Sequence, residues 1–146
     1  MTAAAVKTRE PIRHRHRVCF YETDAMGVVH HSNYLRFFEE ARMHWYLDRK
    51  ISHHDIVDGE RVNFAVVEAQ ARYKSPARYT DEIEVTVYIR QERSTIRFEY
   101  IVRDVSDARL IATGYSVHVP VNKHMKICRI SADMAKLLKE EPWIEI

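Results

Sequence analysis

Residues 21–42 read YETDAMGVVHHSNYLRFFEEAR, and they hold both a loop rich in polar side chains and the beginning of a long helix. From Ser32 onward apolar residues recur at spacings of three and four, which places them on one helix face. These residues are Tyr34, Phe37, Phe38, Ala41 and Trp45. We expect Ser32 to cap a helix that ends near Lys50. A helix of about 18 residues is about 27 Å long, enough to lie across a sheet and bury its apolar face there.

The rest of the chain is typical of strands separated by short polar breaks. Alternating or densely apolar runs predict five strands of an antiparallel sheet, at residues 12–20, 62–73, 83–89, 96–102 and 111–121. Residues 51–60, ISHHDIVDGE, predict a polar connector, and Ser131 is expected to cap a short helix. The order of elements predicts an α+β architecture, in which a curled sheet of about five strands wraps one long helix.

Size and composition limit what the chain can be. Its 146 residues, 46% hydrophobic and 30% charged, suit one domain over residues 1–146, with residues 1–11 as a flexible tail. The formal net charge of +2 gives no reason to expect a nucleic-acid partner. No signal peptide and no transmembrane run of about 18 apolar residues is apparent in the sequence. We therefore expect a cytoplasmic protein.

Cysteines and histidines show no familiar metal-binding pattern. Cys19 and Cys128 lie far apart without C-x-x-C spacing, which fits a reducing compartment better than a disulfide. The adjacent His53 and His54 would point in different directions on a helix and have no third ligand nearby. The sequence has no Gly-rich phosphate loop and no G-x-S-x-G elbow. We expect neither a metal ion nor a cofactor.

The loop before the long helix combines groups that can act on an electrophile. It holds an acid, Asp24, a glycine, Gly27, and two histidines, His30 and His31. Unpaired N–H groups at a helix start can stabilise a developing oxyanion, and a nearby carboxylate can act as base or nucleophile. From the residues alone, the alternative that Asp24 forms an Asx turn and His31 a polar helix cap stays open.

The same stretch carries the pattern T-D-x-x-G-x-V-x-H-x-N-Y-x-x-F-x-E at residues 23–39, with every fixed position matched. This pattern resembles the signature of hot-dog-fold thioesterases of the 4-hydroxybenzoyl-CoA thioesterase type, particularly their YbgC-like acyl-CoA thioesterase branch. Residues 71–85, ARYKSPARYTDEIEV, are similar to that family's strand, Pro-Ala turn and following strand. The resemblance implies the hot-dog fold over nearly the whole chain and the hydrolysis of acyl-CoA thioesters.

The resemblance also implies roles for particular residues. Asp24 would attack the thioester carbonyl or activate water to do so, while the backbone N–H of His31 would polarise the carbonyl oxygen. Substrate-binding positions are expected at Tyr21, Gly27, Val29, His30, Asn33 and Tyr34. The chain departs from the family pattern at Phe20, where many relatives have tyrosine, and at Met26, where a small residue is usual.

Hot-dog domains of this kind pair into dimers, often tetramers, whose active sites form where two subunits meet. The resemblance therefore implies a homodimer or homotetramer. Basic side chains near that seam are candidates to contact CoA phosphates: Arg13, Arg15, Arg17, Lys74 and Arg78. The alternative for the three alternating arginines is an edge strand protected by charge.

Two further functions stand beside acyl-CoA hydrolysis. The first is an acyl-carrier-protein thioesterase with the same fold. The second is a non-catalytic acyl-CoA-binding protein, in which Asp24 serves only the turn. Activity on carrier-loaded acyl groups would identify the first, and tight acyl-CoA binding without turnover would identify the second.

Overall fold

The computed structural model describes residues 9–144, so residues 1–8 of the predicted tail lie outside the described part, as do residues 145–146. The elements follow one another as β1 (Ile12–Arg17), a short 3₁₀ helix η1 (Phe20–Glu22), α1 (Asn33–Asp48), β2 (Asp55–Val57), β3 (Glu60–Tyr73), β4 (Glu82–Glu92), β5 (Thr95–Asp104), β6 (Leu110–Val121) and α2 (Ala132–Lys139).

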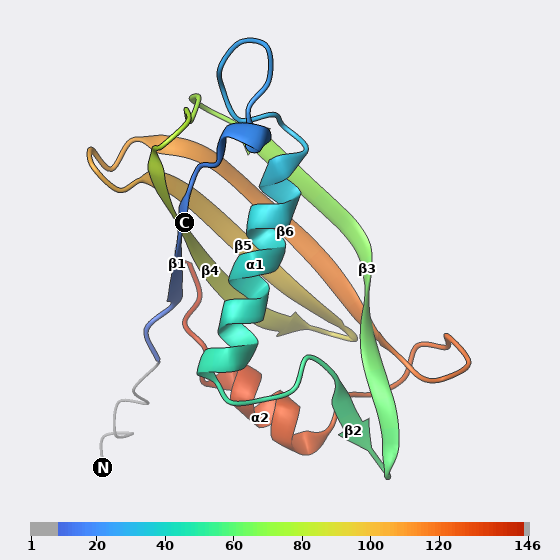
Figure 1. Ribbon diagram of the computed structural model, residues 1–146. Helices are drawn as coiled ribbons and strands as arrows, with labels where there is room; N and C mark the ends of the chain where they lie inside the picture. The colour runs from blue at the N-terminus through green and yellow to red at the C-terminus, as the bar shows by residue number, and fades with distance from the viewer. Residues whose placement is uncertain (1–8, 145–146) are drawn as a thin grey trace, which may run out of the picture.

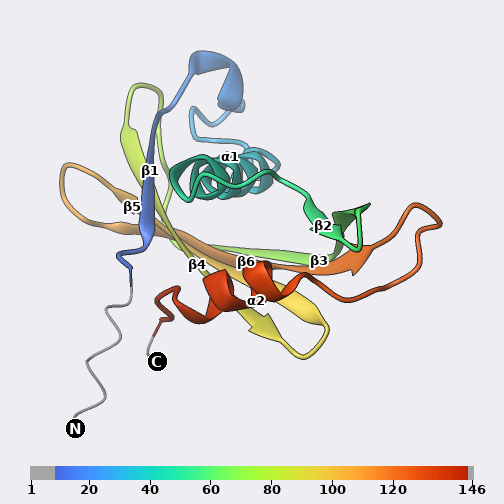
Figure 2. The ribbon, with the colours of Figure 1, turned by 90° about the horizontal axis from the view of Figure 1, so that it is seen from below.

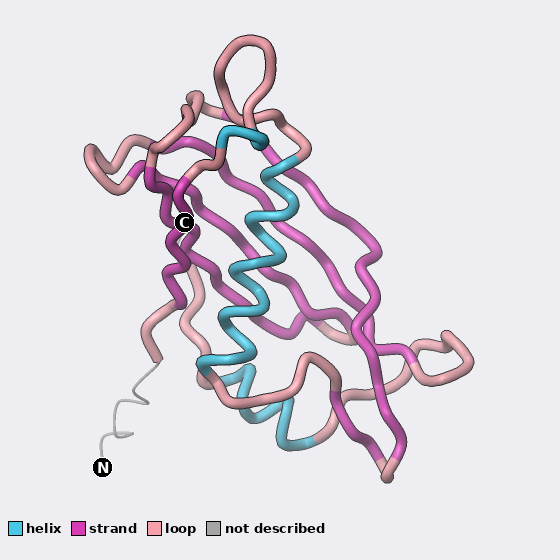
Figure 3. Tube along the Cα trace, viewed as in Figure 1, coloured by secondary structure: helices cyan, strands magenta, loops and turns pink. Residues whose placement is uncertain are grey.

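The strands form one antiparallel sheet in the order β1-β4-β5-β6-β3-β2. Helix α1 lies across one face of this sheet (Figure 1), and the view from below shows the sheet curving around it (Figure 2). Figure 3 shows the same arrangement by element type, with one long helix against a broad layer of strands. The predicted α+β architecture, a curled sheet wrapping one long helix, is confirmed.

The apolar faces predicted from the sequence make the core. Phe37, Phe38, Ala41 and Trp45 on one face of α1 are all buried. They meet the alternate, buried residues of β4 and β5. The ring of Phe38 stacks on Tyr100 of β5 with centroids 4.3 Å apart, so α1 and the sheet are in direct contact.

The sheet has one strand more than the five that the sequence indicated. β2 lies within residues 51–60, the segment predicted to be a polar connector. The carboxylate of Asp55 in β2 accepts hydrogen bonds from the N–H of Ser131 at 2.7 Å and from its hydroxyl at 2.8 Å. Because this contact joins positions 76 residues apart, local composition could not reveal the strand.

The two predicted helix caps differ in outcome. The hydroxyl of Ser131 accepts the N–H of Met134 at 3.1 Å, so this cap is confirmed. Ser32 is the N-cap residue of α1, but its side chain makes no capping hydrogen bond to the helix. Its hydroxyl lies 2.8 Å from Nδ1 of His30 instead. Helix α1 ends at Asp48, near the predicted end.

Candidate active site

The loop from Thr23 to Val29 is a tight hairpin between η1 and α1, at the end of the molecule where α1 begins (Figure 1). The N–H of Asp24 donates to the carbonyl of Val28 at 2.8 Å, and the carbonyl of Asp24 accepts the N–H of Gly27 at 2.9 Å. Gly27 has φ of +78°, a conformation that glycine adopts without strain. The motif glycine thus closes the turn that presents Asp24.

The carboxylate of Asp24 is part of this turn. Its Oδ1 accepts the N–H of Met26 at 2.8 Å, which is an Asx turn. Within residues 9–144, the second oxygen, Oδ2, makes no hydrogen bond to protein. The alternative raised from the sequence is therefore correct about the turn, but it leaves half of the carboxylate available.

His30 and His31 connect the hairpin to α1. The N–H of His30 donates to the carbonyl of Glu22 at 2.8 Å, and the two imidazole rings lie 4.2 Å apart. The carbonyl of His31 accepts the hydroxyl of Tyr73 at 3.3 Å. The N–H of His31 has no acceptor in the part of the chain that the structure describes. This N–H is thus free to bind a ligand oxygen.

A groove of about 350 Å³ opens beside the hairpin and brings several of these groups together. One wall comes from the hairpin and the start of α1, and the other from the end of β3 and the turn that follows. The lining residues are Asp24, Val28, Val29, His31, Tyr34, Tyr73, Lys74, Ser75 and Pro76. The N–H of Val29 donates to the carbonyl of Ala77 at 2.8 Å, which fixes the two walls relative to each other.

Tyr34 is the buried aromatic residue of the groove. Its ring packs between Phe37 and Tyr73, with centroids 5.6 and 5.3 Å away. Burial raises the pKa of its hydroxyl to about 12, with a smaller contribution from Tyr73. The hydroxyl therefore stays protonated at neutral pH and can act as a hydrogen-bond donor.

The predicted site residues divide into two groups. Asp24, Val29, His31 and Tyr34 line the groove together. The remaining four lie outside its lining: Tyr21, Gly27, His30 and Asn33.

Each of these four has another place in the structure. Tyr21 is 73% exposed, and a hydrogen bond with the Cys19 thiol raises the pKa of its hydroxyl. Gly27 forms the turn, and His30 is exposed beside His31. Asn33 is buried and donates from Nδ2 to the carbonyl of Glu22 at 2.8 Å, so it holds the loop against the helix.

Tyr73 is a groove residue that the sequence reasoning did not select. Its place directly before the Ser75-Pro76 turn, where β3 ends, was the only signal available. Lys74, one of the basic residues proposed for CoA phosphates, also lines the groove.

The arginines of β1 have partners on the neighbouring strand. The side chains of Arg13 and Arg15 lie 3.7 and 3.2 Å from the carboxylate of Glu84. Arg17 lies 3.4 Å from Glu82. β1 is at the edge of the sheet, so these contacts agree with the alternative of a charged edge strand.

A long helix wrapped by one curled antiparallel sheet, with an acid-bearing hairpin at the helix start, defines the hot-dog class of thioesterase-like proteins. The family model described as the thioesterase-like superfamily matches residues 18–138. The chain belongs to this superfamily. The predicted hot-dog fold and the prediction of a thioester hydrolase are thereby confirmed.

Known proteins agree with this assignment. An Aquifex aeolicus protein named as a candidate esterase is 37% identical over 131 residues, covering 89% of this chain and 99% of that protein. The acyl-CoA thioester hydrolase YbgC of Escherichia coli O6:H1 is 37% identical over 79 residues, covering 54% of this chain and 58% of that protein. The structure of a 1,4-dihydroxy-2-naphthoyl-CoA thioesterase from Synechocystis has a TM-score of 0.79 at 20% identity, covering 88% of this chain and 95% of that one, which shows the shared fold.

Among the described residues, no helix has the length and apolar content needed to cross a membrane.

Proposed function

We propose that this protein hydrolyses acyl-CoA thioesters in the groove beside the Thr23–Val29 hairpin, with Asp24 as the reacting carboxylate. One observation carries the proposal: Asp24 and His31 line the same groove, and within residues 9–144 the N–H of His31 has no acceptor. A carboxylate and an oxyanion donor are the two groups that thioester hydrolysis most needs, since a thiolate leaves readily without a strong general acid.

Two routes are open to Asp24. As a general base, it takes a proton from water while the water oxygen bonds to the thioester carbon. As a nucleophile, its Oδ2 bonds to that carbon and forms an anhydride that water then hydrolyses. In both routes the carbonyl oxygen becomes negative and is stabilised by the His31 N–H, then the C–S bond breaks and the CoA thiolate takes up a proton.

Three further groove residues suit an acyl-CoA substrate. The hydroxyl of Tyr34 keeps its proton at neutral pH, so it can donate a hydrogen bond to the substrate. Lys74 brings a positive charge to the groove wall and can contact a CoA phosphate. Val29 supplies apolar surface for the acyl chain.

A second copy of the chain would complete this site. β2 pairs only with residues 60–62 of β3, so in the described part of the chain the outer edge of β3 from Asn63 to Tyr73 has no strand neighbour. Val66 and Val67 on this stretch are 53% and 59% exposed. Tyr73 belongs both to this edge and to the groove, which supports a homodimer with active sites at the subunit interface. A homotetramer, a cytoplasmic location and independence of any cofactor stay predictions.

The Asx turn gives one specific reason to consider a binding protein. Because Oδ1 of Asp24 holds the Met26 N–H, the motif aspartate has a structural task that needs no chemistry. In that case the protein would bind acyl-CoA without turnover. The carrier-protein thioesterase has no comparable observation in its favour, but the same assay can test it.

The decisive experiment measures thiol release from short, medium, long-chain and aromatic acyl-CoAs. It compares the wild type with Asp24→Asn, because an asparagine oxygen can still accept the Met26 N–H while the charge is lost. Asp107→Asn is the matched control, since Oδ1 of Asp107 accepts the N–H of Arg109, two residues on, at 3.0 Å in the same kind of turn. We expect Asp24→Asn to lose at least about a hundredfold in rate, about 2.7 kcal/mol of transition-state stabilisation, and Asp107→Asn to retain activity.

Other outcomes would redirect the proposal. Equal activity of wild type and Asp24→Asn would show that Asp24 is not the reacting group. Tight acyl-CoA binding by both proteins with no turnover would identify a binding protein. Hydrolysis of acyl groups only when a carrier protein holds them would identify the carrier-protein enzyme.

A further inference from the structure

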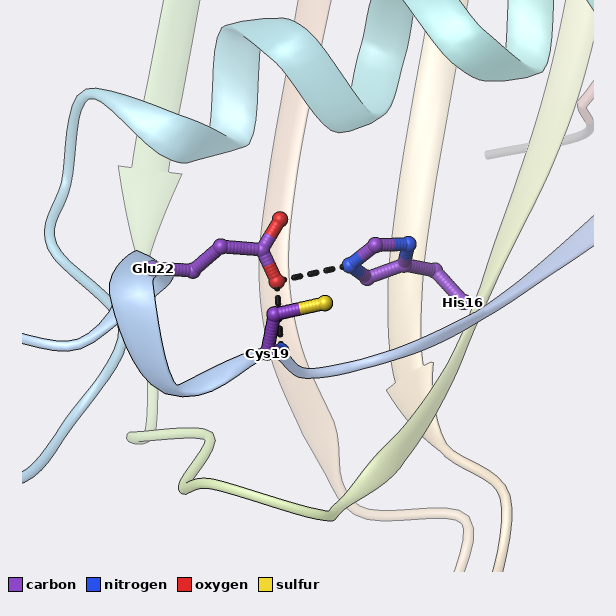
Figure 4. A group of neighbouring side chains, drawn as sticks. All are labelled: His16, Cys19 and Glu22. Carbon is purple, nitrogen blue, oxygen red and sulfur yellow. Dashed lines mark hydrogen bonds and ion pairs between the residues drawn. The ribbon is translucent and has the colours of Figure 1, made fainter.

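Three side chains of different chemistry meet where β1 passes into η1. His16 is in β1, Cys19 precedes η1, and Glu22 is the last residue of η1. One ring nitrogen, the thiol sulfur and one carboxylate oxygen all lie within 4.8 Å of one another. Figure 4 shows the sulfur and the carboxylate both directed toward the imidazole.

The backbone geometry holds these side chains together. In a 3₁₀ turn, residues three apart lie above one another, so Cys19 and Glu22 share one side of η1. Oε1 of Glu22 accepts the N–H of Cys19 at 2.7 Å and lies 2.7 Å from Nε2 of His16. The side chains of Glu22 and His16 are 5% and 16% exposed, which shelters the cluster from bulk water.

A second carboxylate lies near the other side of the imidazole. Nδ1 of His16 lies 3.5 Å from Oε2 of Glu40 on α1. A histidine that binds a metal through one nitrogen usually donates its other N–H to a carboxylate or carbonyl, which fixes its tautomer. Nε2 of His16 faces Glu22, and Glu40 lies near Nδ1, where an outer carboxylate of a metal site would stand.

We propose that His16, Cys19 and Glu22 bind one Zn²⁺ ion through Nε2, the thiolate and a carboxylate oxygen, with water as fourth ligand. A nitrogen, sulfur and oxygen donor set suits zinc better than magnesium or calcium, which prefer oxygen alone. Zn–N and Zn–O distances of about 2.1 Å and a Zn–S distance of about 2.3 Å place tetrahedral ligands about 3.3–3.6 Å apart. The His16–Glu22 contact must therefore lengthen by about half an ångström, within the reach of side-chain rotation.

The ion would brace the segment that precedes the hairpin. The carbonyl of Glu22 accepts the N–H of His30 at 2.8 Å and Nδ2 of Asn33 at 2.8 Å, so η1 is already fastened to the start of α1. Zinc would replace the direct His16–Glu22 contact between β1 and η1 with coordination to three residues. The role assigned to the ion is to brace this segment, and it does not depend on the proposed acyl-CoA hydrolysis.

The sequence contains the spacing H-x-x-C-x-x-E at residues 16–22, but this spacing includes neither a C-x-x-C motif nor a pair of histidines, so no metal was predicted from the sequence. The three ligands converge only because the strand ends at Arg17 and the chain turns at once into η1.

The test uses Co²⁺ as a spectroscopic substitute for zinc, with both thiols kept reduced. A thiolate ligand gives a sulfur-to-cobalt charge-transfer band, which binding by histidines alone does not give, and the chain has 9 histidines. Cys19→Ser is the test variant and Cys128→Ser the matched control, since both residues are half-buried free cysteines. The Cys19 thiol makes a long contact of 3.6 Å to the carbonyl of Arg17 and a hydrogen bond with the hydroxyl of the exposed Tyr21. A serine hydroxyl can replace both, so Cys19→Ser is expected to fold.

We expect the band in the wild type and in Cys128→Ser, its loss on adding Zn²⁺, and its absence in Cys19→Ser. Zinc affinity, measured against a competing chelator, should fall at least about tenfold in Cys19→Ser. Glu40→Gln should keep the band but weaken zinc binding by about tenfold, because Glu40 acts through His16. At one zinc concentration, Tm should rise more in the wild type and in Cys128→Ser than in Cys19→Ser or Glu40→Gln.

Two results would overturn the proposal. One is a wild-type cobalt complex without a thiolate band. The other is zinc binding that is equally tight in Cys19→Ser, which would place the metal on histidines elsewhere. Melting of metal-free Cys19→Ser at the wild-type temperature establishes that the comparison is between folded proteins.

Discussion

Gly114 in β6 controls how closely α1 approaches the sheet, and its replacement by alanine is the sharpest test of the core. A Cβ at this position would lie 2.5 Å from Cε2 of Phe38 on α1 and 2.5 Å from the carbonyl oxygen of Gln70 on β3. Carbon atoms pack best at about 3.5–4.0 Å, so the added methyl group would overlap both neighbours by about an ångström. It would be squeezed between the helix and the next strand.

The expected loss of stability in Gly114→Ala depends on whether the atoms around the added methyl group can move. Overpacking a core by one methyl group costs about 1–3 kcal/mol. The Phe38 ring is stacked on Tyr100, and the Gln70 carbonyl belongs to the backbone of β3, which is paired with β6. We therefore expect Gly114→Ala to lose about 3 kcal/mol in the free energy of unfolding, equivalent to a fall in Tm of about 6–12 °C.

Urea denaturation followed by circular dichroism measures this loss, and Gly59→Ala is the control. A Cβ at Gly59 would meet no atom within 4 Å, but its φ of +76° makes alanine unfavourable there by about 1 kcal/mol. The comparison separates steric overlap from backbone strain. Surface substitutions usually change the free energy of unfolding by no more than about 0.5 kcal/mol. If the change for Gly114→Ala is that small, then α1 does not pack on Gly114 as described.

Two further predictions concern pH and assembly. Burial, with a smaller effect of Arg42, lowers the pKa of His118 from 6.5 to about 4. Below pH 6.5 the unfolded chain therefore binds a proton that the folded chain does not. The free energy of unfolding, measured by urea denaturation, should fall by about 2 kcal/mol between pH 7.5 and 5. His118→Asn should flatten this slope, and an equal slope in both proteins would contradict the assignment. Val67→Lys adds charge to the edge of β3 that has no strand neighbour among the described residues, and it should convert the proposed dimer to monomer in sedimentation equilibrium. Ile127→Lys, also at an exposed apolar residue, should not. An unchanged mass of Val67→Lys would show that the dimer forms elsewhere.

Periodic elements were predictable because their sequence pattern directly reflects burial. The alternation of Ile83, Val85 and Val87 along β4 coincides with their complete burial. The aromatic spacing of α1 likewise marks the face that meets the sheet. Each pattern is set by which side of one element faces the core, so it can be read without knowing the partner element.

Features that depend on distant contacts were not predictable in this way. β2 has three residues and is fixed by the contact of Asp55 with Ser131. Tyr73 reaches the groove because its hydroxyl donates to the carbonyl of His31, 42 positions earlier. The composition of β2 and of the end of β3 does not indicate these contacts. They form only because the folded sheet brings distant parts of the chain together.

The residues from 23 to 34 were a mixed case, because one short segment supplies most of the groove while the sheet decides which side chains face it. Asp24 and His31, which the motif indicated, both line the groove. Tyr21, which the motif also indicated, is exposed to solvent and does not line it. The segment that forms the site could therefore be predicted from the sequence. Which of its side chains line the groove could not be predicted without the fold.

The two interpretations of Asp24 that the sequence left open are compatible in the structure. A carboxylate has two oxygens, and the Asx turn uses only Oδ1. That hydrogen bond fixes the side-chain rotation and so orients Oδ2, which is what a positioned base or nucleophile needs. A side chain that served the turn alone would not require a negative charge, because asparagine forms the same turn. The charged Oδ2 of Asp24, rather than the hydrogen bond of Oδ1 to Met26, is therefore what thioester hydrolysis would demand, and Asp24→Asn removes it while an oxygen remains to form the turn.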